Sequence, residues 1–111
     1  SILRRADAED GTRAFATAPI VLGEPAERDL ALAILGFPDV VAEVAAGSVP
    51  HRMAAYLFDL AQSFTAFYEQ CPVLVADTPE LRNSRLRLSA TVLEVLEAGL
   101  GVLGIRVPER M

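Results

Sequence analysis

Six apolar side chains recur at alternating intervals of four and three residues, and this spacing constrains the fold more than any other feature of the sequence. They are Met53, Leu57, Leu60, Phe64, Phe67 and Cys71. Because residues three and four apart share one face of an α-helix, the pattern predicts a long helix over residues 50–71. Pro72 follows and ends this helix.

Two shorter helices are predicted before it. The first opens with Pro25 and acidic residues, which suit the positive end of a helix dipole, and its apolar face consists of Leu30, Ala33, Ile34 and Phe37. Pro38 ends this helix, because the residue before a proline disfavours the helical conformation. The second covers "PDVVAEVAAG" and closes at Gly47.

A fourth helix is predicted from Thr78, a good N-cap followed by a proline, to Gly104. Gly99 and Gly101 disfavour helix, so they indicate a close helix contact or a loosened last turn. The helix carries two apolar stripes and therefore needs neighbours on two sides. One stripe contains Leu81, Leu88, Val92, Val95 and Val102, and the other contains Leu86, Leu93, Leu96, Leu100 and Leu103.

The segment "VLVAD" at 73–77 resembles a strand, but it has no second strand to pair with, so we predict a connecting loop. The expected fold class is therefore all-α, a bundle of four or five helices with two long members. We expect residues 1–22 to be a linker and the end of a helix from a preceding domain, with the helical domain at 23–111. A short native N-terminal segment is the alternative for the opening "SILRRA".

Composition bounds the class of protein. A chain of 111 residues that is 52% hydrophobic has the size and the apolar content of one folded domain. No apolar run reaches the ~18 residues of a membrane span, and no leader pattern opens the chain, so we expect a cytoplasmic protein without a membrane partner. The formal net charge of −5 argues mildly against a nucleic-acid partner. All ten basic residues are arginine, which suits phosphate contacts and protein ion pairs equally well.

Motifs for catalysis are missing. His51 has no nucleophile beside it, so we predict a surface or capping residue, with a ligand contact as the alternative. Cys71 lies on the apolar seam, which favours a buried thiol over a reactive one. Glu94 and Glu97 fit a solvated helix face, and "GLGVLG" does not follow a strand as a phosphate-binding loop does. We therefore expect no catalysis by this chain alone, and no metal or cofactor in this domain.

A set of short motifs in fixed order resembles the C-terminal anticodon-binding domain of arginyl-tRNA synthetase, the DALR domain. The matching stretches are "PHRMAAYLFDLAQSFTAFY", "SRLRL" and "VLEAGLGVLGIRVPERM". "ERDLALAILGFPDVVAEVAA" resembles the upstream part of that domain. The resemblance implies a helical module that grips the anticodon stem-loop of arginine tRNA. The complete enzyme would be a class I arginine-tRNA ligase, whose separate catalytic domain uses ATP and Mg²⁺.

The resemblance also implies which residues contact tRNA. By matching position, the anticodon-loop contacts fall on Tyr68 and Met111, with Arg110 and Arg106 nearby as phosphate partners. A core tyrosine with its hydroxyl at the rim is the alternative for Tyr68, and a frayed end is the alternative for Met111.

Arg85 and Arg87 match the family's Arg-Leu-x-Leu motif, and for both a structural ion pair across helices is as plausible as an RNA contact. Tyr56 fits a structural role better than an RNA contact. The family often has an aromatic residue where this chain has Cys71 and Pro72, so one stacking surface is missing. A non-catalytic helical module that binds another protein is the alternative function, favoured by the overall acidity.

Overall fold

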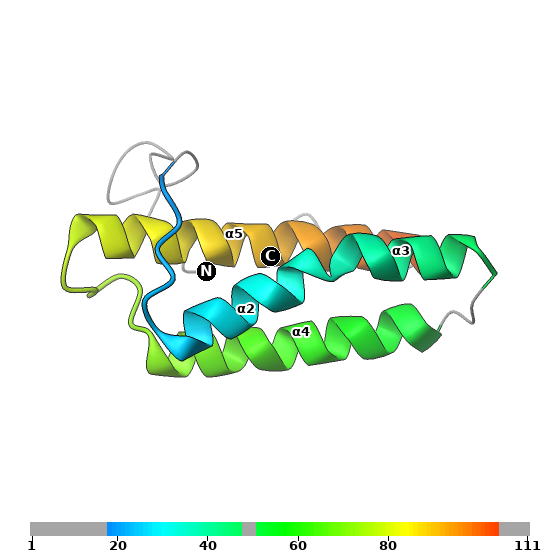
Figure 1. Cartoon of the computed structure of the whole chain (residues 1–111), viewed down its shortest axis with the longest axis horizontal. Coiled ribbons are helices and arrows are strands. Elements are labelled where there is room, and N and C mark those ends of the chain that lie inside the picture. Colours follow the sequence, from blue (N-terminus) through cyan, green and yellow to red (C-terminus); the bar gives the residue numbers. More distant parts are fainter. Residues whose placement is uncertain (1–17, 48–50, 105–111) are drawn as a thin grey trace.

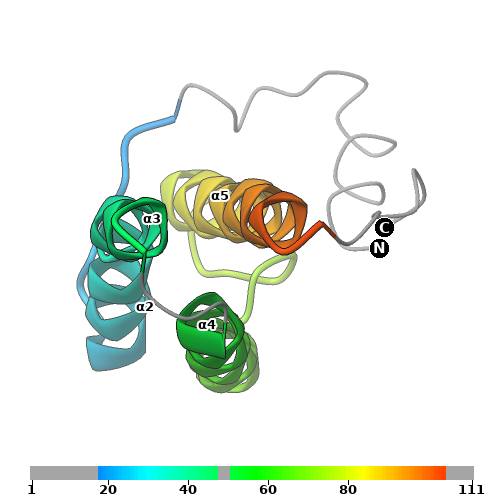
Figure 2. The ribbon, with the colours of Figure 1, turned by 90° about the vertical axis from the view of Figure 1, so that its right-hand side faces the viewer.

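The computed structural model describes residues 18–47 and 51–104, and every regular element within them is an α-helix. These are α2 (Pro25–Leu35), α3 (Phe37–Ala45), α4 (His51–Gln70) and α5 (Pro79–Val102). The two long helices, α4 and α5, run antiparallel, and α2 and α3 follow one another alongside them (Figure 1). Seen end-on, the α2–α3 row, α4 and α5 occupy the corners of a triangle (Figure 2). The all-α prediction is confirmed.

Helix starts follow the predicted caps. The Thr78 hydroxyl accepts a hydrogen bond from the Leu81 N–H at 3.1 Å, so α5 begins where the sequence indicated. At α2, the carboxylate of Glu27 accepts the N–H of Glu24 at 2.8 Å, which satisfies a donor that the helix leaves unpaired. Proline occupies the first turn of both helices.

Helix ends agree with two of the predicted signals and correct a third. Gly47 and Gly104 have positive φ angles of 102° and 78°, the left-handed conformation that favours glycine after a helix. The break between α2 and α3 falls at Gly36, one residue earlier than expected. Phe37 therefore belongs to α3, and Pro38 lies in its first turn, where the missing N–H costs no helical hydrogen bond.

The apolar seam of α4 forms the centre of the core. Five of its six residues are buried and Phe64 is half-buried, which confirms the predicted face. The seam packs against residues of all three other helices, including Leu30 of α2, Val40 of α3 and Val92 of α5. The 73–77 segment is a loop, as expected, and its first residue, Val73, is buried.

Close approach of α4 and α5 explains one of the two helical glycines. A Cβ at Gly99 would lie 2.6 Å from the Leu57 Cδ2 atom, so a larger residue here would force the Leu57 side chain to move. Gly101 has open space around it and makes no such contact. Val102 is 43% exposed although it falls on a predicted apolar stripe.

Candidate nucleic-acid interface

Tyr68 is an exposed aromatic side chain near the end of α4. Half of its surface, 51%, is open to solvent, so the ring is not a core residue. Its centroid lies 6.0 Å from that of Phe64, with the rings inclined at 45°. Phe64 in turn lies 6.0 Å from the fully buried Phe67. The phenol ring thus contacts a row of tilted aromatic rings on its own helix, while about half of its surface is open to solvent.

Three predicted contacts lie outside the described residues. Arg106, Arg110 and Met111 belong to residues 105–111, which the structure does not describe. Their proposed roles beside Tyr68 stay predictions.

Arg85 is directed into the protein. The residue is 7% exposed, its Nε donates to the Glu27 carboxylate at 3.1 Å, and its Nη1 donates to the Pro72 carbonyl at 2.6 Å. This geometry is the structural ion pair across helices that the sequence left open. Direct RNA contact by Arg85 remains untested, but the observed contacts occupy the guanidinium within the protein.

Arg87 and Ser84 hold the segment that precedes α2. Arg87 Nη1 donates to the Ala18 carbonyl at 2.6 Å, and the Ser84 hydroxyl accepts the Val21 N–H at 2.7 Å. Ser84 and Arg87 of "SRLRL" therefore both bind the segment before α2, while the leucines of this motif, Leu86 and Leu88, are buried. An RNA contact by Arg87 likewise stays a prediction.

Glu27 is a fully buried acid that sequence reasoning did not single out as a partner of Arg85. Its exposure is 0%, and its two oxygens serve different partners, the Glu24 N–H and the Arg85 guanidinium. The spacing Glu24-x-x-Glu27 is a capping signal that the sequence does contain. Its second partner lies 58 residues away, and no local pattern points to it.

Two further polar groups of the helices are structural. The Tyr56 hydroxyl donates to the Ala33 carbonyl at 2.6 Å, and burial raises the pKa of this phenol. Cys71 is 1% exposed, and burial is the main cause that raises its thiol pKa. Arg85 opposes that rise, whereas Glu27 and Glu24 add to it. A buried thiol with a raised pKa is a poor nucleophile, which confirms the expected buried role.

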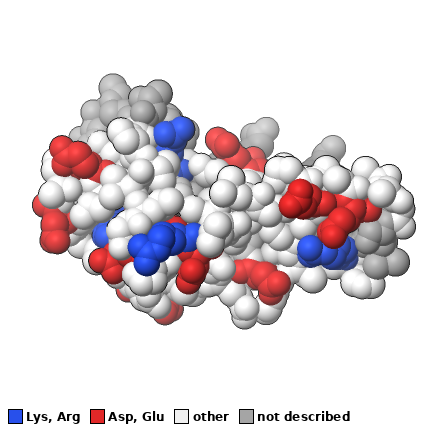
Figure 3. All heavy atoms as spheres, viewed as in Figure 1, with Lys and Arg blue, Asp and Glu red and all other residues white. Residues whose placement is uncertain are grey.

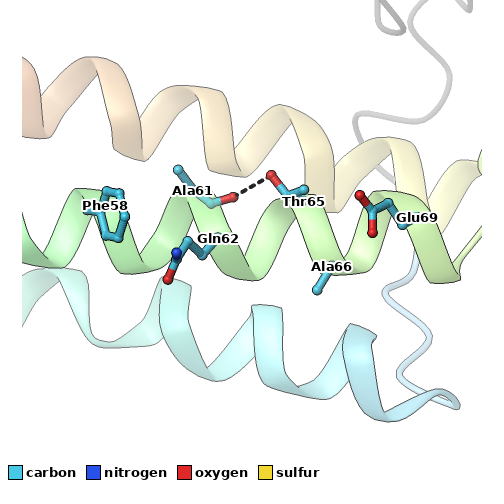
Figure 4. Close-up of a pocket in the computed structure, with 6 residues that line it drawn as sticks. All are labelled: Phe58, Ala61, Gln62, Thr65, Ala66 and Glu69. Atoms are coloured by element: carbon cyan, nitrogen blue, oxygen red, sulfur yellow. Dashed lines mark hydrogen bonds between the residues drawn. The ribbon is translucent and has the colours of Figure 1, made fainter.

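A shallow hollow lies on the outer side of α4, with a volume of about 370 Å³. Figure 4 shows its lining along the helix, where small side chains lie between larger ones. The residues are Phe58, Ala61, Gln62, Thr65, Ala66 and Glu69. Phe58 is 63% exposed. The Thr65 hydroxyl donates to the Ala61 carbonyl at 3.0 Å and not to Glu69, the carboxylate in the lining.

Surface charge and metal-binding groups were the remaining features that could indicate a site among the described residues. On the face in Figure 3, acidic and basic side chains are interspersed and form no continuous basic band. The part of the chain that is described contains no group of three or more His, Cys, Asp or Glu side chains that could hold a metal ion. Among the described helices, none has the length and hydropathy needed to cross a membrane.

Comparisons with known proteins identify one domain family and relatives that share one name. The family described as the DALR anticodon binding domain matches residues 1–111. An arginine--tRNA ligase of Thermobifida fusca (strain YX) is 58% identical over 95 residues, which cover 86% of this chain and 16% of that protein. An arginine--tRNA ligase of Proteus mirabilis (strain HI4320) is 44% identical over 111 residues, covering all of this chain and 19% of that protein. The chain thus spans less than a fifth of the length of these curated relatives.

Proposed function

The chain belongs to the DALR anticodon binding domain family, and from this membership we propose that it recognises the anticodon stem-loop of arginine tRNA. The family resemblance drawn from the ordered motifs is thereby confirmed. In this proposal the chain is part of a longer arginine-tRNA ligase, acts in the cytoplasm and carries out no catalysis itself. ATP and Mg²⁺ would bind to the catalytic domain of that longer enzyme.

The exposed ring of Tyr68 is the observation that carries the proposal. Proteins read single-stranded RNA loops by stacking unpaired bases on aromatic side chains, and each such stack contributes about 1–3 kcal/mol. Tyr68 has an exposed ring for this purpose, and this ring also contacts Phe64, one turn earlier on α4. In the proposed complex Met111 packs a nucleotide beside it, and Arg106 and Arg110 bind phosphates.

The acidic character of the chain sets an expectation for affinity. With a net charge of −5, the isolated domain gains little from general attraction to phosphate. We therefore expect weak binding by this domain alone, with the rest of the longer enzyme supplying further contacts. Specificity for the anticodon is a stronger signature of the proposed function than affinity.

A matched pair of aromatic substitutions tests the proposal. Tyr68→Ala should weaken binding of transcribed arginine tRNA by about tenfold, whereas Phe58→Ala should leave it within about twofold. Phe58 is a suitable control because it is an aromatic residue of the same helix and is even more exposed than Tyr68. The measurement is fluorescence anisotropy with labelled RNA over a salt titration, and an anticodon-swapped tRNA serves as the control ligand. Equal affinity for the two RNAs would exclude anticodon recognition.

A second candidate function is a helical module that binds another protein. The hollow around Phe58 favours it, because an exposed aromatic side chain beside small residues is suited to accept a protein side chain. If Phe58→Ala abolished the function of the longer enzyme while Tyr68→Ala did not, this candidate would replace the first.

A further inference from the structure

The buried ion pair lies where two helix ends meet. Glu27 is in the first turn of α2, near the positive end of that helix dipole. α4 has no basic residue in its last turn, although a cation there would stabilise its negative end. Arg85 of α5 supplies this charge, because its Nη1 donates to the Pro72 carbonyl just beyond the end of α4. One ion pair therefore complements both helix ends.

The same contact fixes the backbone that carries Tyr68. α4 ends at Gln70, and the Cys71 N–H closes its last turn on the Phe67 carbonyl at 2.8 Å. Arg85 binds the carbonyl of Pro72, the residue that follows Cys71. Tyr68 lies within this last turn. In the sequence it stands between Phe67, which accepts the closing hydrogen bond, and Pro72, whose carbonyl Arg85 binds.

The polar atoms of the buried pair have hydrogen-bond partners within the protein. Both charged side chains are almost completely buried, at 8% and 0% exposure, and none of the described buried side-chain nitrogen or oxygen atoms lacks a partner. Glu27 is itself tied to the start of α2 through the Glu24 N–H. The end of α4 is thus connected through Arg85 to the start of α2, while the outer surface of Tyr68 stays open.

We infer that Arg85 and Glu27 are positioning residues for RNA recognition, which they serve by holding the last turn of α4 and with it the ring of Tyr68. The inference rests on the proposed function. A ring that is fixed before binding loses less conformational freedom when a base stacks on it, so the affinity is higher. Without the pair, the last turn opens locally and the ring samples orientations that do not stack.

A double-mutant cycle separates positioning from direct contact. Arg85→Gln should weaken binding of the arginine anticodon stem-loop RNA about fivefold in the otherwise unchanged chain. In a Tyr68→Ala background the same change should have less than about a twofold effect, because the side chain through which Arg85 acts is gone. Arg28→Gln is the matched control, since Arg28 also binds backbone carbonyls, those of Leu22 and Gly23, but does not touch α4 in this way. It should leave the affinity unchanged.

Amide hydrogen exchange gives a second readout. In Arg85→Gln, the Cys71 amide should exchange faster, while amides in the middle of α5 keep their protection. If Arg85→Gln does not fold, Glu27→Gln takes its place in the cycle, because it keeps an oxygen for the Glu24 N–H and removes only the charge.

Each outcome has a distinct meaning. If Arg85→Gln weakens binding equally with and without Tyr68, Arg85 contacts RNA directly or acts elsewhere, and the positioning role is wrong. If Arg85→Gln leaves binding and Cys71 exchange unchanged, the positioning role is likewise overturned. If Tyr68→Ala alone has no effect on binding, the proposed use of Tyr68 fails first, independently of Arg85.

Discussion

The two ends of the bundle are each joined by an arginine–glutamate pair, and the pairs differ far more in burial than in length. Arg85 and Glu27 are 3.1 Å apart with side chains 8% and 0% exposed, whereas Arg52 and Glu43 are 2.9 Å apart and 44% and 49% exposed. Because charges interact more strongly where the effective dielectric is low, the shorter distance does not identify the more important pair. The burial of each pair identifies the more important one.

The helix ends beside each pair add a second contrast. Glu27 and Arg85 each lie at the helix end that favours their charge. Glu43 lies near the C-terminal end of α3 and Arg52 near the N-terminal end of α4, so both oppose the local dipole. The exposed pair therefore mainly offsets the unfavourable interaction of each charge with the dipole of its own helix. At the end that carries Tyr68, by contrast, the charges of the ion pair match the helix dipoles.

Removing one partner of the buried pair should have the largest effect. Arg85→Met leaves the Glu27 carboxylate buried without its cation, and such losses cost about 3–5 kcal/mol in the free energy of unfolding. Urea denaturation followed by circular dichroism measures this cost. A loss below about 1 kcal/mol would mean that the two ends do not differ as described.

Tyr56 lies between the two ends and should give an intermediate effect. Tyr56→Phe removes the hydrogen bond to the Ala33 carbonyl and should cost about 1 kcal/mol at pH 7. Because the folded-state pKa of this phenol is raised, its contribution is present below the usual pKa of about 10 and is lost as the pH rises further.

The advantage of the wild-type chain over Tyr56→Phe should therefore shrink over the pH range above about 10, where the unfolded phenol ionises while the buried phenol stays protonated. Cys71 also has a raised pKa, but it is present in both proteins and cancels in the comparison. A constant difference in unfolding free energy over this range would contradict the assignment of the pKa shift.

The exposed pair should give the smallest effect. Glu43→Gln is expected to change the unfolding free energy by less than about 1 kcal/mol, and the change should shrink in high salt. Thermal unfolding at low and at high salt measures both expectations. A salt-independent cost as large as that of Arg85→Met would remove the distinction between the two ends.

The helices and their caps could be predicted from the sequence because their signals are local. The α4 seam, the Thr78 cap and the glycines at positions 47 and 104 each depend on residues within one or two turns. The pair of Glu27 and Arg85 could not be predicted, since its members lie 58 residues apart and the sequence left Arg85 open between two roles. Val102 shows the same limit, because an apolar stripe does not by itself reveal which of its residues are buried.

The candidate site was predictable only in part. Spacing places Tyr68 beside the seam residue Phe67 and so partly outward, in agreement with its observed exposure. Its role came from the family resemblance and stays a proposal. The aromatic contact of its ring with Phe64 is local to α4, whereas the link from Pro72 through Arg85 to Glu27 depends on tertiary contacts that no local pattern reveals.

Tyrosine fluorescence gives the most direct measurement, because the sequence has two tyrosines and no tryptophan. In a Tyr56→Phe chain, Tyr68 is the only strong emitter. We predict that the arginine anticodon stem-loop quenches its emission saturably, with the same midpoint as binding measured by anisotropy, and that an anticodon-swapped stem-loop does not. Binding of the arginine stem-loop without any change in Tyr68 emission would contradict the account.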